Sequence, residues 1–157
     1  MFPQLDEVLY VVCAICVAVG ALLLWFATRG RRSAARDAAR IRTLVGGEAL
    51  SADAFLAARP ALTGRGDFTG VYVLHNKTRD SYYVGQSTRV VGRVVAHLTG
   101  HGNGDVYADY VYGDEFEVSV VSLATSGYES LDALERDAIA TYGAYDRGYN
   151  RTRGNRN

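Results

Sequence analysis

The sequence of 157 residues predicts a small α+β domain that is preceded by a single transmembrane helix and a helical connector. Three observations predict this organisation: a long uncharged apolar run near the start, two strand-like runs joined by a polar turn, and helical apolar patterns around a third strand. We assign residues 1–28 to the anchor, residues 29–67 to a basic helical connector, and residues 68–157 to the folded domain.

The apolar run covers residues 9–28, LYVVCAICVAVGALLLWFAT, and contains no charged residue. About 20 residues cross a hydrocarbon core at 1.5 Å per residue. A signal peptide fits less well because the preceding region is acidic, and a buried core helix fits less well because no face is polar. Tyr10 near one end, and Trp25 and Phe26 near the other, fit an interfacial aromatic belt. We expect residues 9–28 to anchor the chain in a membrane.

The charges that flank this run predict its orientation. Arg29, Arg31, Arg32 and Arg36 follow the run, and no basic residue precedes it. The positive-inside rule therefore places the N-terminus outside and the folded domain in the cytoplasm. The same arginines also suit anionic lipid head groups, although their effect on topology is enough to explain them.

The connector is predicted to hold two helices. Residues 29–42 are rich in arginine and alanine and predict a helix that stops at the following glycine pair. A second short helix opens at Ser51 and is expected to end at Pro60, because proline lacks the N–H that a helix interior needs. The TGRGD sequence that follows is expected to be a loop, and its cytoplasmic position argues against an adhesion function.

The rest of the chain predicts three strands and two main helices. Strands at 71–75 and 82–86 flank a polar turn, and a third strand is expected at 116–123. Helices are expected at 88–98 and 129–142. The order β-β-α-β-α leaves too little chain for parallel crossovers throughout, so a three-stranded, mainly antiparallel sheet flanked by helices is predicted.

The helix at 88–98 carries a polar stripe beside its valine side. Arg89, Arg93 and His97 follow one another at four-residue spacing, so they lie one turn apart on the same face. A single arginine in such a place is ordinarily solvated. Because Arg93 and His97 lie at the margin of the core and beside a hairpin that contains tyrosines, we expect them to be functional.

Glu135 falls within the apolar stripe of the helix at 129–142. A carboxylate on a face that packs on a core is costly unless it is paired with a cation or binds a metal ion. Two interpretations stay open: a structural ion pair with an arginine, or a ligand for a divalent ion. The neighbouring Asp132, Arg136 and Asp137 are expected on the outer surface.

Two short triplets complete the pattern: GVY at residues 70–72 and YVG at residues 83–85, followed by Arg93 and His97 on the next helix. This pattern resembles the GIY-YIG nuclease family over about residues 68–157. Valine replaces isoleucine in both triplets and keeps a β-branched residue there. The resemblance implies a three-stranded core and an endonuclease that acts on DNA.

The resemblance also implies roles for individual residues. It implies that Tyr72 is the general base on water, and Tyr83 and His97 would orient it or move its proton. A phenol of pKa about 10 needs a stabilised anion for this role. Arg93 is a planar cation suited to phosphate oxygens. Glu135 would bind one divalent metal ion, Mg²⁺ or Mn²⁺.

Contacts with DNA are expected outside this catalytic set. The segment at residues 148–150 resembles the family's GYN segment, which places Asn150 beside the site. Arg89, and Arg151 and Arg153 in the basic tail with Arg156, are candidate contacts to the DNA backbone. A frayed, solvated tail explains the tail arginines almost equally well. No sequence-reading module and no small-molecule cofactor are expected.

The predicted function is that of a membrane-anchored, metal-dependent endonuclease hydrolysing DNA phosphodiester bonds. The chain has 17 basic and 17 acidic residues, so its overall charge does not indicate a nucleic-acid partner. Two alternatives therefore stay open. One is a catalytically inactive DNA-binding module of the same fold, and the other is a membrane-tethered interaction domain without a nucleic-acid partner.

Overall fold

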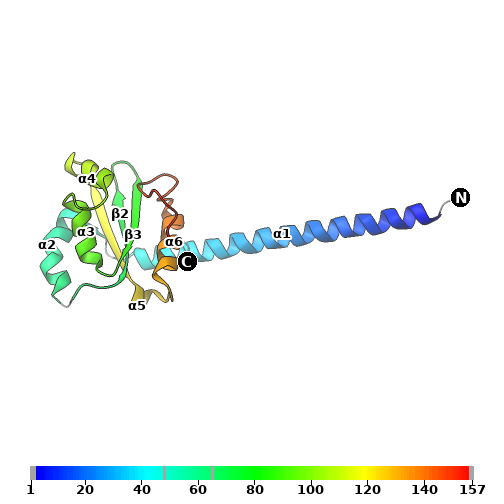
Figure 1. Cartoon of the computed structure of the whole chain (residues 1–157), viewed down its shortest axis with the longest axis horizontal. Helices are drawn as coiled ribbons and strands as arrows, with labels where there is room; N and C mark the ends of the chain where they lie inside the picture. Colours follow the sequence, from blue (N-terminus) through cyan, green and yellow to red (C-terminus); the bar gives the residue numbers. More distant parts are fainter. Residues whose placement is uncertain (1–2, 48, 65, 156–157) are drawn as a thin grey trace. The chain divides into compact units, whose positions relative to one another are not determined.

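The computed structural model describes residues 3–47, 49–64 and 66–155 (Figure 1). The chain forms two compact units, Met1–Asp37 and Ala38–Asn157, which are described separately. Helix α1 (Pro3–Val45) accounts for the described part of the first unit and contributes its last residues to the second.

The first unit is helical. Within α1, Val12–Val45 is long and apolar enough to cross a membrane by length and composition, so it is a candidate transmembrane anchor. Its apolar side chains, such as Leu23 and Phe26, are exposed, as expected for a helix without a protein core around it. The side chain of Tyr10 lies outside the described part of the chain.

The second unit is built on a four-stranded antiparallel sheet with the strand order β1-β4-β2-β3. The prediction of three strands was therefore wrong by one. The extra strand, β1, is only two residues long, which is too short to carry an alternating pattern, and it pairs with β4. The strands are β1 (Leu50–Ser51), β2 (Gly70–Asn76), β3 (Ser81–Ser87) and β4 (Phe116–Ser122).

Five further helices surround the sheet, and Figure 1 shows α2 and α3 on one side of the strands and α6 on the other. Helix α2 continues past Pro60, contrary to prediction; the Thr63 hydroxyl donates to the Arg59 carbonyl in the turn after the proline. The helices are α2 (Ala52–Thr63), α3 (Val90–Leu98), α4 (Gly104–Val111), α5 (Leu123–Ser126) and α6 (Leu131–Tyr142).

Each face of the sheet has its own core. Tyr72 and Leu74 of β2 face the core formed with α2, α3 and α4, whereas Val71 and Val73 face the core formed with α6. The central strand is therefore buried on both faces, which explains its continuous apolar run. The connector belongs to these cores: Ile41 and Val45 join the α6 side, and Ala52 and Phe55 join the α3 side.

Helix α3 begins with a cap that comes from far away in the sequence. Its N-cap residue, Arg89, makes no side-chain cap bond. Instead the Asp67 carboxylate accepts hydrogen bonds from the backbone N–H groups of Val91 (2.9 Å) and Gly92 (2.8 Å). Burial alone would raise the pKa of Asp67, but these hydrogen bonds and the charge of Arg89 hold it below its usual value. The aspartate of the RGD triplet is thus a helix cap.

Candidate active site

The β2–β3 hairpin places two tyrosines on one face of the sheet. The register pairs Tyr72 with Gly85 and Leu74 with Tyr83, so both tyrosine rings lie on the α3 side, with centroids 6.1 Å apart. The Tyr72 ring lies directly over Gly85, where a Cβ atom would overlap the Tyr72 hydroxyl. The glycine of the second triplet therefore makes room for the tyrosine of the first.

Helix α3 brings His97 to these tyrosines. The His97 ring is fully buried, and its Nε2 atom lies 2.9 Å from the Tyr72 hydroxyl. On its other side, Nδ1 accepts the backbone N–H of Asn103 at 2.7 Å. A ring nitrogen that accepts cannot carry the proton, so the proton of neutral His97 is on Nε2 and is donated to Tyr72. Burial and the charge of Arg93 lower the pKa of His97 to about 4, so the ring is neutral at pH 7.

The loop before α4 fixes this histidine. A Cβ atom at Gly102 would overlap the His97 ring, so this position has room only for glycine. The side chain of the next residue, Asn103, caps α4 through the N–H groups of Asp105 and Val106. Neither Gly102 nor Asn103 was predicted from the sequence, and both hold His97 in place.

The two tyrosines differ in exposure and in acidity. Tyr72 is only 1% exposed, and burial raises its pKa well above the usual range. The pKa of the partly buried Tyr83 is also raised by burial, although interaction with Tyr72 and the charge of Arg93 make this rise smaller. Tyr72 accepts a hydrogen bond from His97 Nε2, and its pKa rises further than that of Tyr83. Tyr83 is therefore the member of the coupled pair that ionises first.

Arg93 lies on the exposed side of α3, near enough to Tyr72 that its charge opposes the rise of the Tyr72 pKa. Arg89, one turn earlier, is also exposed. The predicted stripe is therefore split: His97 points into the core, and the two arginines line the surface beside it.

Glu135 is partly buried on α6, and the Gln86 side chain of β3 connects it to the hairpin. The Gln86 amide donates to Glu135 at 3.0 Å and to Asp132 at 2.6 Å. Asp132 is therefore partly buried and bonded to Gln86, so the prediction of a solvated outer-surface residue was wrong. Burial is the largest cause that raises the pKa of Glu135, with the Asp132 charge adding to it and the Gln86 hydrogen bonds opposing it. The charge of Glu135 in turn acts on Tyr83.

The two interpretations of Glu135, an ion pair and a metal ligand, can be compared with its surroundings. Within the described ranges, no arginine pairs with Glu135, and no group of three or more histidine, cysteine or acidic residues could form a complete metal cage. Two neighbouring carboxylates, Asp132 and Glu135, are nevertheless hard oxygen donors of the type that Mg²⁺ accepts, with water and substrate oxygens filling the remaining positions.

Arg89 lies beside the candidate site with Arg93, whereas the predicted DNA contacts of the C-terminal segment have other partners. The Asn150 side chain is bonded to the backbone of Val84, donating at 2.7 Å and accepting at 2.8 Å, so it fastens the C-terminal segment to the edge strand β3. Arg151 pairs with the exposed Asp105 at 3.1 Å. Arg156 lies outside the described residues.

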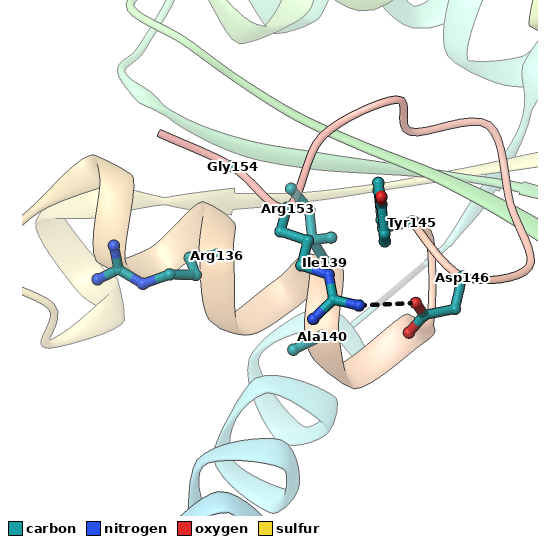
Figure 2. A pocket seen from close by; sticks show the side chains of 7 residues that line it. All are labelled: Arg136, Ile139, Ala140, Tyr145, Asp146, Arg153 and Gly154. Carbon is teal, nitrogen blue, oxygen red and sulfur yellow. Dashed lines mark hydrogen bonds and ion pairs between the residues drawn. The ribbon is translucent and has the colours of Figure 1, made fainter. Parts of the chain in front are cut away.

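Arg153 belongs to a separate hollow of about 280 Å³, shown in Figure 2. Its guanidinium lies over the Tyr145 ring and pairs with Asp146 at 3.4 Å. Ile139 and Ala140 of α6 line this hollow. None of its lining residues belongs to the tyrosine–histidine cluster, which consists of Tyr72, Tyr83 and His97.

Comparison with known protein families gives one match. Residues 68–150 match the GIY-YIG catalytic domain. The matched segment begins beside the Asp67 cap and ends at Asn150, so it contains the hairpin, both site helices and the closing asparagine. Comparisons with curated proteins and with solved structures give no match.

Proposed function

Because this chain belongs to the GIY-YIG family, we propose that it is an endonuclease that hydrolyses DNA phosphodiester bonds with the help of a divalent metal ion. The observation that carries the proposal is the buried chain of hydrogen bonds from Asn103 through His97 to Tyr72, with Tyr83 and the Arg93 cation beside it. Such an arrangement fixes a proton path next to a phosphate-binding group.

In this proposal the two tyrosines act as one base. Family membership points to Tyr72, but its hydroxyl is buried, so a proton taken from water has to pass through the more accessible Tyr83. Tyr72 would stabilise the Tyr83 phenolate by donating its proton to it, while His97 donates to Tyr72 and the charge of Arg93 acts on both tyrosines. His97 acts as a donor that holds Tyr72 and not as a base, because Asn103 already occupies its second nitrogen.

Two further groups act on the phosphate. Arg93 places a permanent planar cation beside the tyrosines, where it binds non-bridging phosphate oxygens as negative charge grows on them. Glu135, with Asp132 beside it, would hold Mg²⁺ or Mn²⁺. The bound ion would supply positive charge to the phosphate and lower the pKa of a water molecule.

We further propose that residues 1–28 anchor the protein in a membrane with the N-terminus outside, and that residues 29–67 connect the anchor to the catalytic domain at 68–157 in the cytoplasm. The candidate span in α1 and the arginines that follow it support this topology. Retention of the full chain in membranes after carbonate washing, and release of a chain that lacks residues 1–28, would test the anchor.

The test of the function is cleavage of supercoiled plasmid by the full chain in neutral detergent with Mg²⁺ or Mn²⁺. The full chain is needed because Ile41, Val45, Ala52 and Phe55 belong to the cores, so a truncated protein that begins near residue 60 would lack part of them. We expect metal-dependent nicking that Glu135→Ala and Tyr72→Phe abolish. Absence of nicking, or equal nicking by these variants, would reject the enzyme.

The same experiment separates the two alternatives. Binding of DNA that weakens with salt, without nicking by any variant, would identify a catalytically inactive DNA-binding module. Absence of both binding and nicking would favour a membrane-tethered interaction domain.

A further inference from the structure

Beside the tyrosine–histidine cluster runs an open groove of about 360 Å³. It lies between the end of α2 and the first turns of α3, and its most polar members are three arginines. One of them, Arg59 of α2, was given no role in sequence analysis. The lining residues are Arg59, Ser87, Arg89, Gly92, Arg93 and Ala96.

The groove has a surplus of positive charge, which the nearby Asp67 carboxylate offsets only in part. Its lining contains no carboxylate, and none of its three arginines forms an ion pair with an acid that the structure describes. Some other arginines of the same unit do form ion pairs: Arg79 pairs with Asp109 at 2.9 Å, and Arg151 pairs with Asp105 at 3.1 Å. On a chain with no net charge, such a local surplus favours an anionic partner.

The start of α3 does not itself provide the anion site. The Asp67 carboxylate already occupies the N–H groups of Val91 and Gly92. An anion in the groove would therefore be bound by guanidinium groups, which favour the planar oxygens of a phosphate.

The groove is continuous with the candidate active site through one residue. Arg93 lines the groove, and its charge also acts on Tyr72. A nucleic-acid strand whose reacting phosphate lies at Arg93 would carry its neighbouring phosphates along the groove, since the strand bears one charge per nucleotide.

We propose that Arg59 of α2, together with Arg89, binds the phosphates that neighbour the cleaved phosphate on the same DNA strand. This inference rests on the proposed function and extends it, because Arg59 lies in the connector, outside the residues that match the family domain. The connector then has a second role beyond its packing in the core: it forms one wall of the DNA-binding track.

The test measures the affinity of the full chain for a labelled duplex oligonucleotide at several salt concentrations, in a Glu135→Gln background that stops cleavage. Arg59→Gln is compared with Arg59→Lys and with the matched control Arg136→Gln, an exposed arginine of α6 on the other side of the sheet. Thermal unfolding of each variant checks that the fold is kept, which we expect because Arg59 is exposed.

We expect Arg59→Gln to weaken binding roughly five-fold and to lower the slope of log affinity against log salt by about 0.9, whereas Arg59→Lys and Arg136→Gln leave the slope unchanged. An unchanged slope in Arg59→Gln, or an equal loss in the Arg136 control, would overturn the inference.

Plasmid cleavage by the chain with Glu135 intact separates this inference from the function itself. If the plasmid is cleaved and Arg59→Gln leaves the slope of log affinity against log salt unchanged, only the role of Arg59 is rejected. An Arg59-dependent slope without cleavage rejects the nuclease and keeps the phosphate track.

Discussion

Helices α3 and α6 each carry a polar residue next to an apolar stripe, but the two residues differ in burial and in hydrogen bonding. His97 of α3 is fully buried, and both of its ring nitrogens are hydrogen bonded. Glu135 of α6 is partly buried, is bonded to the Gln86 amide, and has a raised pKa. The α3 side is thus complete without a ligand, whereas the α6 side holds a carboxylate whose charge is stabilised only in part. This difference is the reason why the proposed metal ion is placed on the α6 side.

The largest expected effects come from removing one functional group on each side. Tyr72→Phe and Glu135→Gln should each lower nicking at least about 10²-fold. Their stabilities should differ: Tyr72→Phe leaves the buried N–H of His97 without an acceptor, at a cost of about 1–3 kcal/mol in the free energy of unfolding. Glu135→Gln removes a carboxyl group whose stability contribution is present below pH 4.5 and is lost as the pH rises through the raised pKa, so it should not destabilise at pH 7.

Kinetic assays combined with chemical denaturation of both variants measure this contrast. Equal destabilisation by the two substitutions would contradict the difference between the two helices.

The buried histidine predicts a pH dependence on the α3 side. Because the pKa of His97 falls from 6.5 in the unfolded chain to about 4 in the folded one, its contribution to stability is full above pH 6.5. That contribution should be lost as the pH falls to about 4 and amounts to about 3 kcal/mol. Denaturation of the wild type and of His97→Gln between pH 4 and 8 measures it as a difference that shrinks toward acid. A constant difference would mean that the pKa of His97 is the same in the folded and the unfolded chain.

The loop that fixes His97 offers a steric test. Gly102→Ala places a Cβ atom against the His97 ring, which should cost about 1–3 kcal/mol of stability and reduce nicking, because the histidine moves away from Tyr72. Gly104→Ala is the matched control, since a Cβ atom there meets no atom within 4 Å. Denaturation and nicking of the two variants are compared. A normal rate of nicking in Gly102→Ala would show that the position of His97 is not critical.

The smallest expected effect concerns the starts of the two helices. Asp67→Ala removes the cap of α3 and should cost about 1 kcal/mol at pH 7. Ser130→Ala removes the cap of α6, whose single side-chain bond is longer at 3.4 Å, so its cost should be smaller. Chemical denaturation of both variants measures the stability that each cap contributes. A larger loss in Ser130→Ala than in Asp67→Ala would contradict the prediction.

The parts of the fold that repeat a pattern over several residues were predictable. The strands β2, β3 and β4, the valine side of α3 and the stripe of α6 all lie where the periodicity placed them. Strand β1 was missed because two residues show no period. The helix that was expected to end at Pro60 runs on to Thr63, because loss of one backbone hydrogen bond does not always end a helix.

The candidate site also has residues that were predictable from the sequence and residues that were not. Tyr72, Tyr83 and His97 were predictable because triplets and helical spacing bring them to one face, and the structure brings them together. The cap at Asp67 and the contact of Asn103 with His97 were not predictable, because they join segments that share no period in the sequence. The roles of the site residues stay predictions that the assays above would test.

The contact between Tyr72 and Gly85 limits the length of the turn that joins β2 and β3. The two positions face each other across the hairpin, so the length of the turn between the strands sets whether the ring meets a glycine or a side chain. A single residue inserted at 77–80 would shift the register and move Tyr83 to the opposite face of the sheet. The length of this turn, which contains no candidate catalytic residue, is therefore a geometric requirement of the candidate active site.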